Sequence, residues 1–173
     1  MTQAIKVLTS VSASQIIRNG ATGNWSAAAH KVADYPYVVC VRHGNHPASP
    51  KDVPHKTAFL IGRILKAVET DELDGKGNPR LLIMFDEYAE IKVPDVWGDS
   101  QNPVGYFDLE KAGINVTDLK FTAVADEDRI AVVGIDKFEK GGEIVGISFE
   151  DARKGIALRY GVDPRAVEIT IRG

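Results

Sequence analysis

The stretch VCVRHGNHPASPKDVPHK, residues 39–56, gathers the side chains with the clearest capacity for chemistry. It holds His43, His46 and His55, which are three of the chain's four histidines. His43 and His46 have i, i+3 spacing, and His55 can approach them if the loop folds back, which would bring together neutral imidazoles of the kind that bind zinc. The cysteine pairs and the HExxH pattern that mark most zinc sites are missing. We therefore predict solvated or hydrogen-bonded histidines, with no bound metal and no cofactor.

Patterns typical of catalysis are weak elsewhere in the sequence. Cys40 is central in an apolar run, which predicts an unreactive thiol, and the serines around Ser12 stand where a helix cap is expected. Neither the GxSxG pattern nor the GxxxxGKS/T phosphate loop occurs. Asp86 and Glu87 follow an apolar strand, with Glu90 beyond them, and these carboxylates form a charged rim, bind a metal or serve as acid and base. The sequence favours a protein that is not an enzyme.

Two tryptophans stand outside the clearest predicted elements. Trp25 lies in the small-residue stretch GNWSAAAH, and Trp97 lies in VPDVWGDSQNPVGY, which is broken by proline and glycine. Tryptophans in loops either cover the edge of a core or line a ligand pocket, and both interpretations stay open for this pair.

Polar and aromatic side chains near these tryptophans can supplement a binding site. Amide and phenol groups can read the edge of a flat heterocycle; they belong to Asn24, Asn102, Tyr35 and Tyr106. Arg42 and Lys56 flank the histidine loop and can meet phosphate. We expect these residues to border one binding face.

Hydrophobic patterning predicts the elements that must position these groups. Ser12 is expected to cap a helix that ends before Gly20, and a loop is expected over residues 20–36. Strands are expected at 4–8, 37–41, 58–65, 80–85, 88–93 and 130–135. A turn near Asp74-Gly75 joins 58–85 into a hairpin, and a short helix begins near Asp108. The histidine loop is the long connection between two strands, and long connections in compact domains are usually functional or disordered.

The C-terminal segment, 148–171, has its own predicted helix and strand. Ser148 caps a helix that stops at Gly161, and the strand AVEITI follows at 166–171. One helix face carries Phe149, Ala152, Ile156 and Tyr160. We expect this face to pack on the core, so that deletion of the segment unfolds the protein.

Composition sets the class. The chain has 173 residues, 44% of them hydrophobic, which is enough for one core, and we predict a single domain, 1–173. The expected class is α+β, with a curved, mostly antiparallel sheet or a small barrel. A net charge of -3 argues against nucleic-acid binding by bulk electrostatics. The single cysteine, the lack of a leader pattern and the lack of a long apolar run predict a cytoplasmic protein with no membrane partner.

The segments YPYVVCVR, AFLIGRILKAV, RLLIMFDEY and NPVGYFDLEKAGI follow a Trp-bearing stretch in an order that resembles the PUA-like superfamily, in particular its EVE and ASCH branches. The likeness covers residues 24–121. It implies a small twisted barrel and a pocket for a nucleobase. The positions implied to line that pocket are Asn24, Trp25, Ser26, Tyr35 and Arg42.

The function predicted from these observations is that of a non-catalytic reader. A free or flipped base, unmodified or modified, would stack on Trp25, and flanking phosphates would meet Arg42 and Lys56. The expected partner is thus a nucleic acid or a nucleotide. Two alternatives stay open: a small hydrolase acting on nucleotides through the loop histidines, and a protein-interaction domain.

Overall fold

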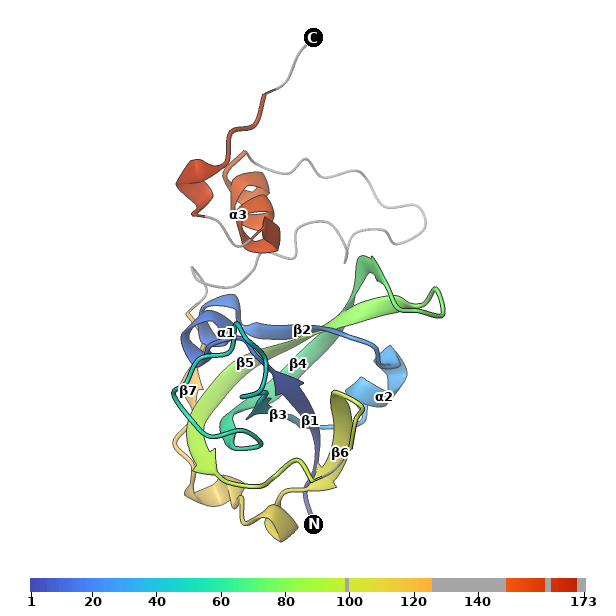
Figure 1. The fold of residues 1–173 in the computed structure, drawn as a ribbon, viewed down its shortest axis with the longest axis vertical. Helices are drawn as coiled ribbons and strands as arrows, with labels where there is room; N and C mark the ends of the chain where they lie inside the picture. The colour runs from blue at the N-terminus through green and yellow to red at the C-terminus, as the bar shows by residue number, and fades with distance from the viewer. Residues whose placement is uncertain (99, 126–148, 161–162, 171–173) are drawn as a thin grey trace. The chain divides into compact units, whose positions relative to one another are not determined.

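The computed structural model describes residues 1–98, 100–125, 149–160 and 163–170 (Figure 1). It divides the chain into two compact units, Met1–Arg129 and Ile130–Gly173, and each unit is described by itself. The expected organisation as a single domain stays a prediction.

The first unit is built on a seven-stranded sheet. Its path runs through β2 (Ala21–Trp25), β5 (Pro79–Val93), β4 (Ala58–Leu73), β3 (Tyr37–Arg42), β1 (Gln3–Thr9) and β6 (Val104–Asp108), and β7 (Thr122–Ala123) pairs with β5 (Figure 1). The β1–β3 pair is parallel and the other pairs are antiparallel. Among the described residues β2 and β6 end the path without pairing to each other. The mostly antiparallel α+β class is confirmed, and the small barrel is wrong because the sheet is open.

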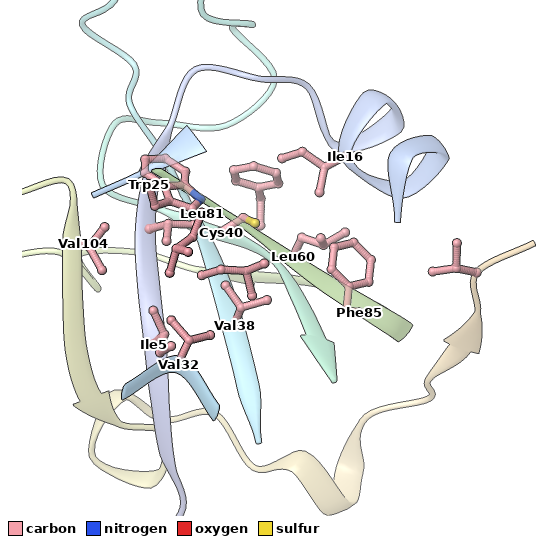
Figure 2. Packing of buried hydrophobic residues seen from close by; sticks show 14 residues of the cluster. Ile5, Ile16, Trp25, Val32, Val38, Cys40, Leu60, Leu81, Phe85 and Val104 are labelled. Carbon is pink, nitrogen blue, oxygen red and sulfur yellow. The ribbon is translucent and has the colours of Figure 1, made fainter. Parts of the chain in front are cut away.

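The central strand β3 is buried on both faces of this sheet. Val38 and Cys40 belong to one core cluster, whereas Val39 and Val41 belong to a second cluster. Side chains alternate between the faces of a strand, so an uninterrupted apolar run fits a strand that is covered on both sides. Figure 2 shows the first cluster, in which Leu60 of β4 and Leu81 of β5 lie near Cys40.

The predicted first helix is confirmed, together with both of its ends. Helix α1 spans Ala13–Asn19, the Ser12 side chain accepts a hydrogen bond from the Gln15 backbone N–H, and Gly20 closes the helix at a φ of 59°. A side-chain oxygen satisfies a free backbone N–H at the start, and glycine adopts the left-handed conformation at the end without a Cβ clash. The expected strand at 4–8 is β1.

The loop expected over residues 20–36 is wrong. This stretch contains β2 and the short helix α2 (Ala29–Ala33). β2 has few β-branched residues, but its pairing with β5 sets Ala21 beside Met84 and Trp25 beside Leu81. Tertiary pairing outweighs weak strand propensity here. Trp25 therefore ends a strand, which removes the premise that it is a loop tryptophan.

The predicted hairpin is confirmed and is longer than expected. β4 and β5 pair from Ala58↔Val93 to Leu73↔Pro79, and the separate strands predicted at 80–85 and 88–93 form one strand. Register shifts interrupt the ladder, as expected for strands that bend strongly. Asp74 organises the turn, since its carboxylate accepts hydrogen bonds from the backbone N–H groups of Lys76 and Asn78. These bonds lower the pKa of Asp74 well below its usual range.

The segment after β5 contains a strand that the sequence did not indicate. β6 pairs with β1, and the Asp108 carboxylate at its end accepts hydrogen bonds from the backbone N–H groups of Glu110 and Lys111. These bonds support the start of the 3₁₀ helix η1 (Glu110–Ala112), whose N-cap residue is Leu109 rather than Asp108 as predicted. A second 3₁₀ helix, η2, spans Val116–Asp118.

In the second unit the predicted helix is α3 (Phe149–Tyr160), and the 3₁₀ helix η3 (Pro164–Ala166) follows. Residues 167–170 are not in a strand, so the strand predicted at 166–171 is wrong over its described part. Within this unit Phe149 is 57% exposed, Ile156 is 39% exposed and Ala157 is buried. The expectation that the apolar face of the helix packs on the core stays a prediction. Periodicity alone does not reveal which face finds a partner.

The predicted strand at 130–135, Ser148, Gly161 and the side chain of Tyr160 lie outside the described residues. In the described part of the chain, no helix has the length and apolar character needed to cross a membrane.

Candidate functional site

The structure brings the three histidines of the 43–56 loop together. The ring centroids of His43 and His46 lie 6.0 Å apart, and those of His43 and His55 lie 5.8 Å apart, each pair edge to face. Gly44 allows the backbone of His55 to approach closely, because a Cβ at position 44 would lie 3.0 Å from the His55 Cα. The loop thus folds back as the sequence suggested.

The hydrogen bonds of His46 and His55 work against metal binding and general-base catalysis by these two rings. His55 Nδ1 accepts a bond from the Gly44 backbone N–H at 3.1 Å, and His46 Nδ1 accepts one from the Ala48 N–H at 3.2 Å. A neutral imidazole whose Nδ1 accepts must carry its proton on Nε2, which then has no lone pair for a proton or a metal. No group of three His, Cys, Asp or Glu side chains in the described part of the chain is arranged to hold a metal ion.

Arg42 is buried rather than presented to a ligand. Its side chain is fully buried, and its guanidinium donates hydrogen bonds to the Val11 carbonyl at 2.7 Å and to Asp52 Oδ2 at 2.8 Å. The guanidinium carbon also lies 4.1 Å from the centroid of the Phe59 ring. The structure therefore does not offer Arg42 to phosphate as the sequence prediction required. Instead, Arg42 ties the loop to the first core cluster.

Lys56 lies at the other end of the loop in a left-handed backbone conformation, with a φ of 66°. Its backbone N–H donates to the Arg42 carbonyl at 2.9 Å, and its own carbonyl accepts from the Val96 N–H at 3.0 Å. The side chain is half-buried. Lys56 therefore joins the loop to both β3 and the segment that carries Trp97.

Trp25 lies within the first core cluster rather than on the surface. It is 8% exposed, and Figure 2 shows its ring beside Leu81 and among aliphatic side chains. Its indole N–H is buried and has no hydrogen-bond partner among the described residues. This placement favours a packing role over a stacking platform, because only a small part of the ring meets solvent.

Trp97 is also buried, in the second core cluster. It is 3% exposed, and its indole N–H donates to the Ser100 carbonyl at 2.9 Å. The Lys6 ammonium donates to the Val96 and Trp97 carbonyls at 2.8 and 3.1 Å and lies over the Trp97 ring. Burial lowers the pKa of Lys6. Trp97 thus covers an edge of the second core cluster, and the hydrogen bonds from Lys6 fix its backbone.

Tyr35 and Tyr106 form the most accessible aromatic group among the predicted site residues. Their rings stack with centroids 5.0 Å apart and an interplanar angle of 27°. Tyr106 is 43% exposed, and Tyr35 is half-buried against the first core cluster. Burial, followed by the effect of Tyr35, raises the pKa of Tyr106. Asn102 is exposed just before β6, and its side-chain oxygen accepts the Val104 N–H at 3.2 Å.

Asn24 and Ser26 lie beside the turn end of the β4–β5 hairpin instead of with this tyrosine pair. The Asn24 carbonyl accepts a hydrogen bond from the Arg80 guanidinium at 3.1 Å. The Ser26 hydroxyl donates to Asp74 Oδ2 at 2.9 Å. Both residues therefore hold the end of β2 to the hairpin. The sequence identified Asp74 only as a turn residue, and this link over a large sequence separation had no local signal.

Cys40 is unsuited to nucleophilic catalysis. Burial raises the pKa of its thiol to about 12, and smaller opposite effects come from a hydrogen bond to Thr22 and from the Arg42 charge. The thiolate, which is the reactive form, is scarce at neutral pH when the pKa is this high.

Comparison of the chain with protein-family models, with curated proteins and with solved structures finds no match. The PUA-like resemblance therefore stays a prediction, and the case for a function depends on the geometry of the described residues.

Proposed function

We propose that this chain is a non-catalytic binding domain that recognises a nucleobase, in a free nucleotide or in a single-stranded nucleic acid. The supporting observation is the stacked pair of Tyr35 and Tyr106, whose rings lie 5.0 Å apart and of which Tyr106 is 43% exposed. A base can stack on such a pair because every base has an aromatic face, and each stacked base contributes about 1 to 3 kcal/mol. The proposed base-stacking surface is thus the tyrosine pair rather than Trp25.

The two tyrosines are held in place before any ligand arrives. Tyr35 follows α2 and packs against the first core cluster, and Tyr106 lies in β6 opposite Ile5 of β1. Rings fixed by packing lose little conformational freedom on binding. The phenol of Tyr106 is protonated at neutral pH, as a tyrosine ordinarily is, so the hydroxyl can donate to a base or a sugar.

Charge contributes little to this recognition. The chain has a net charge of -3, and the Arg42 guanidinium is buried against Asp52. Few phosphates are then neutralised on binding, and few counterions are released. We expect weak binding with a shallow dependence on salt, and discrimination that depends on the base rather than on the backbone.

The test is a titration of nucleoside monophosphates and short single-stranded DNA and RNA, with unmodified and methylated bases, at two salt concentrations. Tyr106→Ala should weaken binding about 5- to 150-fold, the equivalent of one lost stacking contact, whereas Tyr106→Phe should retain most of the affinity. Phe149→Ala, which removes an exposed aromatic ring from α3, is the matched control. Wild-type protein that binds none of these probes, or Tyr106→Ala that binds as well as wild type, would contradict the proposal.

A second candidate, a protein-interaction domain, is favoured by the outer edge of β6. The Leu8 N–H donates to the Pro103 carbonyl and the Leu109 N–H donates to the Thr2 carbonyl, so residues 103, 105, 107 and 109 direct their backbone groups toward β1. The backbone N–H and carbonyl of Tyr106 then point away from β1, where no described strand pairs with them. Such an edge can accept an added peptide strand.

The substitution Tyr106→Pro separates the two candidates. Proline removes the outward N–H while leaving the β1 pairing of its neighbours, so it blocks strand addition. A peptide partner captured by wild type and lost with Tyr106→Pro, but retained with Tyr106→Ala, would favour the protein-interaction domain over the nucleobase reader.

A further inference from the structure

We propose that Lys31, exposed in the last turn of α2, holds a phosphate of the ligand whose base stacks on Tyr35 and Tyr106, so that the site prefers nucleotides to nucleosides. This inference rests on the proposed function, because it names a second contact of the same ligand. Three observations carry it: the position of α2 beside the tyrosine pair, the lack of a partner for Lys31 among the described residues, and the engagement of other basic side chains elsewhere.

Helix α2 and the tyrosine pair cover the same face of the sheet. Val32 of α2 belongs to the first core cluster, and Tyr35 packs against that cluster. Ile5, which lies opposite Tyr106 in the β1–β6 ladder, belongs to the same cluster, and cross-strand partners share one face of a sheet. The stacked rings join the end of α2 to β6, and the two elements are neighbours in Figure 1. Side chains on this side of α2 therefore border the stacked rings.

Lys31 lies on the side of α2 that faces Tyr35. The Asp34 N–H donates to the Lys31 carbonyl at 3.4 Å and the Tyr35 N–H donates to the Val32 carbonyl at 3.1 Å, so the helical turn continues to Tyr35. At about 3.6 residues per turn, Lys31 and Tyr35 are about 40° apart around the axis, and Tyr35 lies between Lys31 and the buried Val32. Lys31 is thus the exposed neighbour of the half-buried tyrosine.

The Lys31 ammonium is available to an anion. The side chain makes no hydrogen bond or ion pair with any residue that the structure describes. Asp34 lies on the other side of Lys31 from Tyr35 by the same helical geometry, and the two charged groups do not pair. An ammonium is a point charge on a flexible stem, so it can meet a phosphate oxygen without the fixed geometry that a guanidinium needs.

Other basic side chains of the sheet are engaged elsewhere. Arg42 is fully buried. The Lys6 ammonium donates to the Trp97 carbonyl at 3.1 Å, within the second core cluster. Arg63 pairs with Glu87 at 2.9 Å. A single phosphate contact from Lys31 also fits the shallow salt dependence that is expected of the site.

The two kinds of contact act on different parts of the ligand. Stacking acts on the base, whereas a phosphate contact positions the ligand and carries no information about the base. A nucleoside makes only the first contact and a nucleotide makes both. Because an exposed ion pair contributes little in water, we expect a small preference for the nucleotide, about 2- to 5-fold in affinity.

The test is an NMR titration with adenosine and uridine, each as the nucleoside and as the 5′-monophosphate, at low salt. Lys31→Gln should remove the preference for the monophosphate and leave the nucleoside affinity unchanged, whereas Lys31→Arg should retain the preference. Tyr106→Ala should weaken both forms alike. With a six-residue oligothymidylate, Lys31→Gln should reduce the slope of log affinity against log salt by about 0.7, the value of one phosphate contact on a single strand.

Lys92→Gln is the matched control. Lys92 is an exposed lysine of β5 without a partner among the described residues, and β4, β3 and β1 separate its strand from β6. It should behave as wild type. Nucleosides that bind wild type as tightly as the monophosphates, or a preference that survives in Lys31→Gln, would overturn the role of Lys31 and leave the base site in place. Wild-type protein that binds neither form would remove the proposed function and this inference together.

Discussion

Substitution of Trp25 separates a packing role from a ligand-binding role. Trp25 is 8% exposed and packs in the first core cluster beside Leu81. Truncation of a buried tryptophan to alanine removes its packing and leaves a cavity, which costs about 3 to 5 kcal/mol of unfolding free energy. For a protein of this size that loss lowers the melting temperature by roughly 6 to 20 °C. We therefore expect Trp25→Ala to be severely destabilised.

Trp25→Phe sharpens the test because it changes two contributions of opposite sign. The smaller ring loses some buried apolar area, but the substitution also removes an indole N–H that is buried without a partner among the described residues. A buried unsatisfied donor costs about 1 to 3 kcal/mol, comparable with the packing that is lost. We expect Trp25→Phe to be within about 1 kcal/mol of wild type.

The assay is urea denaturation followed by far-ultraviolet circular dichroism, which does not depend on the fluorescence of the substituted residue. The product of the midpoint shift and an unchanged slope gives the change in stability. A Trp25→Ala protein that keeps the wild-type midpoint while losing nucleotide binding would refute the packing argument and restore Trp25 as the platform.

Three further predictions follow from particular contacts. Gly62→Ala should cost about 1 to 3 kcal/mol, since its Cβ would lie 2.6 Å from the Phe85 ring, whereas Gly75→Ala, with nothing within 4 Å, should be neutral in the same denaturation assay. Asp74 has a lowered pKa, so its stabilising effect is present above about pH 4 and is lost as pH falls further. Asp74→Asn should therefore reduce the fall of the melting temperature in acid. A variant whose melting temperature falls as much in acid as that of wild type would contradict this. A chain of residues 1–129 should melt cooperatively, because both core clusters consist of residues of this unit within the described part of the chain. A truncated chain that stays unfolded would instead support the expectation that the C-terminal segment, 148–171, packs on the core.

Local signals in the sequence identified several elements correctly. Ser12 and Gly20 mark the ends of α1 because capping depends on side chains and backbone angles within a few residues. The turn at Asp74 was visible for the same reason, since its carboxylate bonds to backbone groups that follow it in the chain. The run YVVCV was recognisable as a strand because a strand covered on both faces must be apolar throughout.

The failures have a common cause, which is that long-range pairing decides the outcome. β2 and β6 are strands because β5 and β1 lie beside them, and neither strand has the alternation that would reveal it alone. In the C-terminal segment, 148–171, strand propensity is present without a strand: AVEITI has strong strand propensity, yet residues 167–170 are not in a strand. Propensity is a weak prior where no neighbouring strand is found.

The sequence by itself determined which groups stand in the 43–56 loop, and it determined that histidines rather than cysteines supply its chemistry. Only the tertiary structure decided what those groups do. The fold buries Arg42 against Asp52 and Phe59, turns His46 and His55 into acceptors of backbone hydrogen bonds, and leaves Tyr106 as an accessible ring. Exposure and hydrogen-bond direction depend on residues far away in the chain, so residue type and spacing cannot specify them.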